Sequence, residues 1–138
     1  MNRKIKFRAW DKNKKAMILD IQKAYDGLIN NREYGWISCF DDFLDSDKFK
    51  VMQYTGLIDK NGIEVYDGDI VYLYDEKCII SWHLGGWILN KVNKSDYDRL
   101  LNGYLAKRKN GQYYSDCIEV IGNVYENKEL LEDGNVRS

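Results

Sequence analysis

No proline occurs in this 138-residue chain, although average usage of about 5% predicts several. Its turns must therefore be made by glycine, asparagine and aspartate. Cysteine and histidine are also scarce, with only Cys39, Cys78, Cys117 and His83. An odd number of cysteines, together with a basic amino terminus that leads into no apolar signal segment, predicts free thiols and a cytoplasmic location.

This scarcity limits the chemistry that the chain can perform. A nucleophilic cysteine would need His83 beside it, no Cys-x-x-Cys motif offers a zinc site, and Gly85-Gly86 lacks the Lys-Ser/Thr of a phosphate loop. We therefore predict no catalytic residues, no cofactor and no metal ligands, and hence a protein that is not an enzyme.

One alternative stays open: Glu64, Asp67 and Asp69 surround a turn and have the chemistry of a magnesium site. Aspartates that only shape the turn are the favoured explanation.

Long apolar runs and an excess of one charge are missing too. No stretch approaches the roughly 18 apolar residues of a membrane span, so we expect no membrane partner. Twenty-one Lys and Arg against 22 Asp and Glu give a net charge of −1, which excludes a strongly basic nucleic-acid coat protein. A 44% hydrophobic and 31% charged composition predicts a globular protein of one domain or two small lobes.

The first part of the chain, residues 1–50, predicts a β-hairpin with short helices. Apolar and basic residues alternate over 4–10, residues 11–14 form a turn, and 16–19 return as the second strand. Residues 21–29 have helical spacing, and Ser38 to Asp41 resembles a capping box before Phe43 and Leu44. Asp41 and Asp42 would then lie in the first turn of a short helix.

The second part, residues 51–138, predicts mainly strands. Asp-Lys-Asn-Gly at 59–62 is a strong hairpin signal, and residues 78–89 form another hairpin around Gly85-Gly86. The spacing of apolar residues predicts a helix over 96–108 with Ser95 as its N-cap, a last strand over 118–125 and a helical turn over 127–131. The expected fold is α+β and mainly β: short antiparallel strands form a bent sheet or an SH3-like barrel, with two or three short helices. The two parts form either separate lobes or one folding unit.

Three segments of the chain resemble the YopX family of small phage and prophage proteins. They are residues 5–11 (IKFRAWD), 51–71 (VMQYTGLIDKNGIEVYDGDIV) and 120–127 (VIGNVYEN). The resemblance implies a phage-derived protein with a small helical contribution, a β-barrel-like second half and self-assembly. It implies no activity. Lys128 departs from the family, which usually has proline there.

Two hypotheses for function follow. The first is a non-enzymatic phage or prophage accessory protein in the cytoplasm of the bacterial host, an oligomeric binding module that acts on a host or phage macromolecule and counters host defence. Strand 70–74 is apolar on both faces, so Ile70, Tyr72 and Tyr74 are the expected self-association face of a homo-oligomer. The alternative is a nucleic-acid-binding protein or metal-dependent enzyme of phage replication. Its expected nucleic-acid patch consists of six basic residues: Lys4, Lys6, Arg8, Lys107, Arg108 and Lys109.

Overall fold

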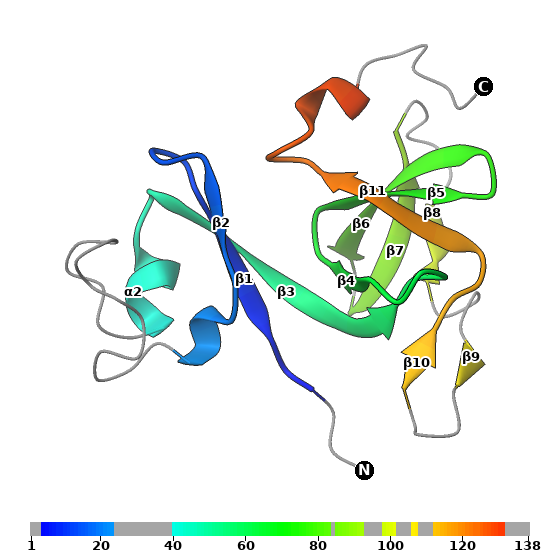
Figure 1. Cartoon of the computed structure of the whole chain (residues 1–138), viewed down its shortest axis with the longest axis horizontal. Coiled ribbons are helices and arrows are strands. Elements are labelled where there is room, and N and C mark those ends of the chain that lie inside the picture. The colour runs from blue at the N-terminus through cyan, green and yellow to red at the C-terminus, as the bar shows by residue number, and fades with distance from the viewer. Residues whose placement is uncertain are drawn as a thin grey trace. The chain divides into compact units, whose positions relative to one another are not determined.

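The chain is described by a computed structural model that covers residues 4–23, 40–83, 85–92, 98–101, 106–107 and 112–131 (Figure 1). Its contacts divide into two compact units, one comprising Lys4–Tyr54 and the other running from Thr55 onward. The division lies close to the predicted boundary after residue 50 and falls within one long strand. Each unit has its own hydrophobic core.

The first unit is built on a small antiparallel sheet with the strand order β2-β1-β3. Strand β1 (Phe7–Asp11) and strand β2 (Ala16–Ile18) form the predicted hairpin, which is confirmed. The first half of β3 (Phe49–Ile58) pairs with the other edge of β1. Asp11 is buried and its Oδ1 accepts the N–H groups of Asn13 and Lys14 at 2.9 and 3.1 Å, which fixes the hairpin turn.

A short helix closes the core of this unit. Helix α2 (Phe40–Asp45) carries Asp41 and Asp42 in its first turn, as predicted. Phe43 is fully buried and its ring lies 5.0 Å from that of Phe49. Of the predicted helix over 21–29, the structure shows a 3-10 turn η1 (Ile21–Lys23), and residues 24–29 lie outside the described ranges.

In the second unit, the end of β3 pairs with β4 (Glu64–Tyr66) and, in parallel, with β10 (Tyr113–Tyr114), which in turn pairs with β9 (Ala106–Lys107). The other sheet has the order β11-β5-β6-β7-β8, with β5 at Asp69–Leu73, β6 at Glu76–His83, β7 at Gly86–Lys91, β8 at Asp98–Leu100 and β11 at Ile118–Asn123. A 3-10 turn η3 (Lys128–Leu131) follows. The mainly β, α+β class is confirmed. The two hairpins predicted for this unit, around residues 59–62 and over 78–89, are confirmed as well. Of the two predicted forms, a bent sheet or an SH3-like barrel, the barrel is not the one observed, because the sheets do not close.

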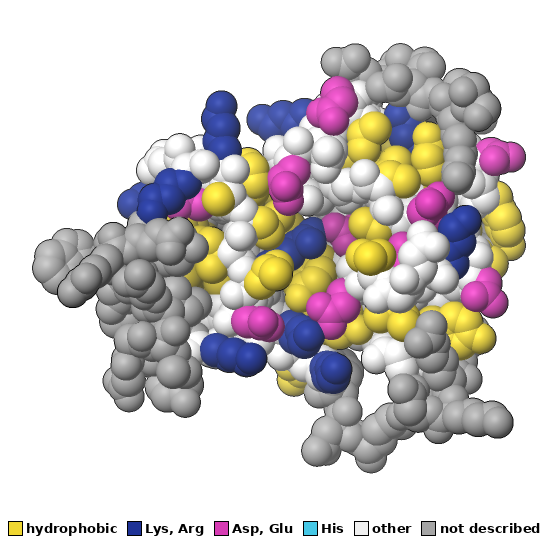
Figure 2. All heavy atoms as spheres, in the orientation of Figure 1, with side chains coloured by type: hydrophobic (Ala, Val, Ile, Leu, Met, Phe, Trp, Pro, Cys, Tyr) yellow, Lys and Arg dark blue, Asp and Glu magenta, His cyan; other side chains and the backbone are white. Residues whose placement is uncertain are grey.

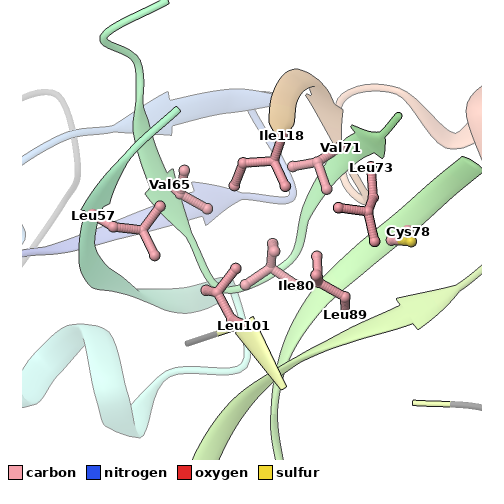
Figure 3. Packing of buried hydrophobic residues seen from close by; sticks show 9 residues of the cluster. All are labelled: Leu57, Val65, Val71, Leu73, Cys78, Ile80, Leu89, Leu101 and Ile118. Carbon is pink, nitrogen blue, oxygen red and sulfur yellow. The ribbon is translucent and has the colours of Figure 1, made fainter. Parts of the chain in front are cut away.

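The core of the second unit lies between these strands. Nine buried side chains from β3 to β11 converge on one another (Figure 3), and these are Leu57, Val65, Val71, Leu73, Cys78, Ile80, Leu89, Leu101 and Ile118. Alternate residues of β5 and β6 therefore face this core, as the period of two in a strand requires.

The predicted helix over 96–108 is wrong. Asp98–Leu100 instead forms β8 and adds an antiparallel strand to the edge of β7, and Ala106–Lys107 forms β9 against β10. Backbone pairing with an available sheet edge and burial of Leu101 outweigh the helical spacing of the apolar residues. Ser95, the predicted N-cap, lies outside the described ranges.

Candidate functional site

The turn between β3 and β4 is organised by one buried carboxylate. Asp59 is fully buried, and its Oδ1 accepts the N–H groups of Asn61 at 2.8 Å and Ile63 at 2.9 Å. Its Oδ2 accepts the N–H of Val120 on β11 at 2.8 Å. Gly62 closes the turn with a φ of 83°, a conformation that favours glycine. Asp59 therefore fastens this turn to a strand some sixty positions further along the chain, which is a structural role.

The three carboxylates of the alternative magnesium site lie in and beside the next turn, between β4 and β5. Asp69 is buried and its Oδ2 accepts the N–H of Tyr66 at 2.8 Å, so it shapes the turn before β5. Glu64 and Asp67 are partly exposed. Burial, and secondly the negative charge of Asp67, raise the pKa of Tyr125 above its ordinary value. Within the part of the chain that the structure describes, no three His, Cys, Asp or Glu side chains are grouped to hold a metal ion.

The thiols and the imidazole occupy separate environments. Cys78 is buried in the core on β6, whereas His83 is exposed at the other end of that strand. Five positions along a strand span about 16 Å and place two side chains on opposite faces, so these two groups do not form a nucleophile and base pair. Cys117 is partly buried and shares a 3.2 Å hydrogen bond with the hydroxyl of Tyr74. Cys39 lies outside the described residues.

A pair of tryptophans marks the end of the β6–β7 hairpin. Trp82 and Trp87 occupy directly opposite positions, with ring centroids 5.0 Å apart and planes at 76°, an edge-to-face arrangement. Trp87 packs against the hydrophobic core, while 57% of Trp82 remains exposed. Gly85 makes the tight turn beyond them with a φ of 83°. Sequence reasoning missed this site because alternation with Cys78 and Ile80 places Trp82 on the core face, where a buried ring is the ordinary expectation.

The predicted self-association residues do not share one exposed surface. Ile70 is fully buried within the chain itself, Tyr72 is half-buried, and Tyr74 is 64% exposed but lies beyond the end of β5 with a φ of 57°. Lys77, opposite Tyr72 on the same face of the sheet, donates from Nζ to the carbonyl of Leu130 at 2.6 Å. Part of this face is thus reached by the chain's own η3 turn.

The six basic residues of the predicted nucleic-acid patch are distributed over both units. Lys4 is exposed, and Lys6 and Arg8 are partly exposed, in the first unit. The Nζ of Lys6 lies 5.9 Å from the centre of the Tyr54 ring. Lys107 belongs to β9 in the second unit. Arg108 and Lys109 are outside the described residues.

Comparisons with known proteins bear on the fold and the family. The crystal structure of protein EF1440 from Enterococcus faecalis is similar over 95% of this chain and 100% of that chain, with a TM-score of 0.60 and 24% identity, which indicates a shared fold. None of the curated proteins compared with the chain matches it. Within the described residues, no helix is long and apolar enough to cross a membrane. The profile of the YopX family, described as YopX protein, matches residues 6–132, and the chain therefore belongs to that family.

Proposed function

We propose that this chain is a non-enzymatic phage or prophage accessory protein that works by binding a host or phage macromolecule and so counters host defence. The observation that carries the proposal is the exposed Trp82 at the end of the β6–β7 hairpin. Tryptophan is the residue type most enriched among the few interface residues that dominate binding energy. The buried carboxylates support the same reading, because Asp59 and Asp69 accept backbone N–H groups and so have a structural role.

The geometry around Trp82 suits a contact with another protein. Trp87 is anchored in the core and presents an edge-to-face partner at 5.0 Å, so the exposed ring of Trp82 is already oriented before a partner arrives. A ring held in place loses little conformational entropy when it is buried in a complex. Antiparallel pairing of all eight positions of β6 with β5 or β7 gives the site a rigid base.

Self-association is part of the proposal. Tyr72 and Tyr74 supply aromatic surface near the β5–β6 turn, and a net charge of −1 opposes association only weakly. We expect a homo-oligomer at micromolar concentration in sedimentation velocity, and Tyr74→Glu should dissociate it. Tyr113→Glu, at another exposed tyrosine of the same unit, is the control and should leave it intact. A 16.3 kDa particle for the unmodified chain would contradict this part of the proposal.

The binding role is tested by capture from a lysate of the bacterial host. Immobilised wild-type protein should retain a defined macromolecule, read by mass spectrometry for protein and by sequencing for nucleic acid. Trp82→Ala should lose it. The matched control is Ile63→Ala, which also removes an exposed apolar side chain, one that is 50% exposed in the β3–β4 turn. Equal capture by all three proteins would refute the role of Trp82, and capture of nothing by the wild type would refute the binding module.

A further inference from the structure

A second surface, in the first unit, gathers positive charge from two separate segments of the chain. The turn between β1 and β2 contributes Lys12, Lys14 and Lys15, all exposed. The antiparallel pairing of β1 with β3 places the exposed Lys48 and Lys50 beside that turn, since Asp11 pairs with Phe49 and the N–H of Lys12 donates to the carbonyl of Lys48 at 3.0 Å. Dark-blue side chains stand out at the upper left of Figure 2, where Figure 1 draws this turn.

We propose that this lysine cluster (Lys12, Lys14, Lys15, Lys48 and Lys50) is a binding surface for single-stranded nucleic acid, contacting its phosphate backbone. The neighbouring acids do not cancel the charge. Asp11 is buried in the turn and occupied by two backbone amides, and exposed Asp47 is adjacent in sequence to Lys48. Asp45, which is exposed at the end of α2, also lies close in sequence to Lys48. Five ammonium groups against three carboxylates still leave a local excess of positive charge on a chain that is nearly neutral.

The cluster is held on a rigid frame. Asp11 fixes the turn through its two hydrogen bonds, Lys15 closes it with a φ of 52°, and the Lys12 to Lys48 bond ties the turn to the start of β3. Because the backbone that carries the lysines is already ordered, binding requires no further ordering of the protein backbone at this surface.

Trp10 favours nucleic acid over an acidic peptide or a lipid surface. It pairs directly with Lys50 on β3 and Met17 on β2, so these three side chains share one face of the sheet, and the indole is only partly buried. An aromatic ring beside a basic track is the arrangement by which proteins stack the bases of single strands while neutralising their phosphates. This surface is separate from the proposed contact at Trp82, because it belongs to the Lys4–Tyr54 unit and Trp82 belongs to the other unit.

The test is fluorescence anisotropy with a labelled 20-nucleotide single strand over a range of salt concentrations. If all five lysines neutralise phosphates, affinity should fall about 100-fold between 50 and 200 mM salt. In the triple variant Lys12→Gln, Lys48→Gln and Lys50→Gln the fall should be only about sevenfold over the same range. A control variant with the same charge change, Lys23→Gln, Lys60→Gln and Lys128→Gln, should behave like the wild type.

Further variants keep the outcome decisive. Trp10→Leu should weaken binding about tenfold through lost stacking, and Trp10→Phe should retain most of it, with melting temperatures confirming that both are folded. Trp82→Ala should bind the oligonucleotide normally, which separates this surface from the proposed function. Equal losses in the cluster and control variants would overturn the proposal. So would binding to vesicles containing phosphatidylserine without binding to the oligonucleotide.

Discussion

Replacing Asp59 by alanine should destabilise the second unit more than any exposed substitution near it. The carboxylate is fully buried and accepts three backbone N–H groups, from Asn61, Ile63 and Val120, at 2.8 to 2.9 Å. Alanine removes all three acceptors at once. It also removes the side-chain link between the β3–β4 turn and β11, so that the backbone hydrogen bond from the N–H of Lys60 to the carbonyl of Ile118 at 3.2 Å remains.

The magnitude follows from the donors left behind. A donor that loses its partner in a protected site costs about 1–3 kcal/mol. Asn61 and Ile63 belong to an exposed turn where water can replace the carboxylate, so their cost lies at the low end of that range. The N–H of Val120 belongs to a paired strand and has less access to water. We therefore expect a loss of about 3–5 kcal/mol in the free energy of unfolding.

Urea denaturation followed by circular dichroism and tryptophan fluorescence measures this loss. With a slope of about 2 kcal/mol per molar urea, the midpoint should fall by about 2 M. Asp59→Asn should lose less stability than Asp59→Ala. Asparagine keeps one acceptor oxygen, and its NH2 group replaces the other, so a backbone N–H there loses its acceptor. The control is Lys60→Ala, which removes an exposed ion pair with Glu119 at 3.9 Å and should cost under about 1 kcal/mol. A loss below about 1 kcal/mol in Asp59→Ala would refute the structural role of this carboxylate.

Three other measurements test separate parts of the account. Gly62→Val should cost about 1 kcal/mol or more in urea denaturation, because a β-branched residue is strained at a φ of 83°; an unchanged midpoint would contradict the turn geometry. With magnesium, manganese or zinc, the protein should hydrolyse neither nucleic acids nor nucleotides, and turnover that vanishes in Asp67→Ala or Asp69→Ala would show a metal enzyme. The raised pKa of Tyr125 implies stability that is fully present below pH 10.0 and is lost as pH rises through the higher folded-state value. Above pH 10, the melting temperature of Tyr125→Phe should therefore fall less steeply with rising pH than that of the wild type. Identical profiles for the two proteins would argue against a buried phenol.

Local patterns predicted the hairpins of this protein well. Alternation and turn residues located the 4–19 hairpin, the 59–62 turn and the 78–89 hairpin, because register and turn chemistry are encoded in neighbouring residues. The same local reasoning failed over 96–108. There the spacing of apolar residues favoured a helix, but residues 98–100 pair with the edge of β7. Such pairing depends on the tertiary structure and has no signal in the local sequence.

The candidate surfaces depended on contacts between distant residues, and these could not be predicted. Neither the bond from Asp59 to Val120 nor the approach of Lys48 to the β1–β2 turn has a local signal. Trp82 shares the core-facing alternation of its strand but lies near the end of the hairpin, where 57% of the residue is exposed. The apolar second face of 70–74 suggested a partner subunit, yet Ile70 is buried by the chain itself.

Hydrogen–deuterium exchange on the captured complex tests the central claim most directly, because it locates the contact on this chain. Peptides spanning residues 79–83 and 85–89 should exchange more slowly in the complex than in the protein alone. Peptides covering the Asp59 turn, which does not carry the proposed contact residue Trp82, should be unchanged. Unaltered exchange across the β6–β7 hairpin, with protection confined to other segments, would contradict a binding role for Trp82.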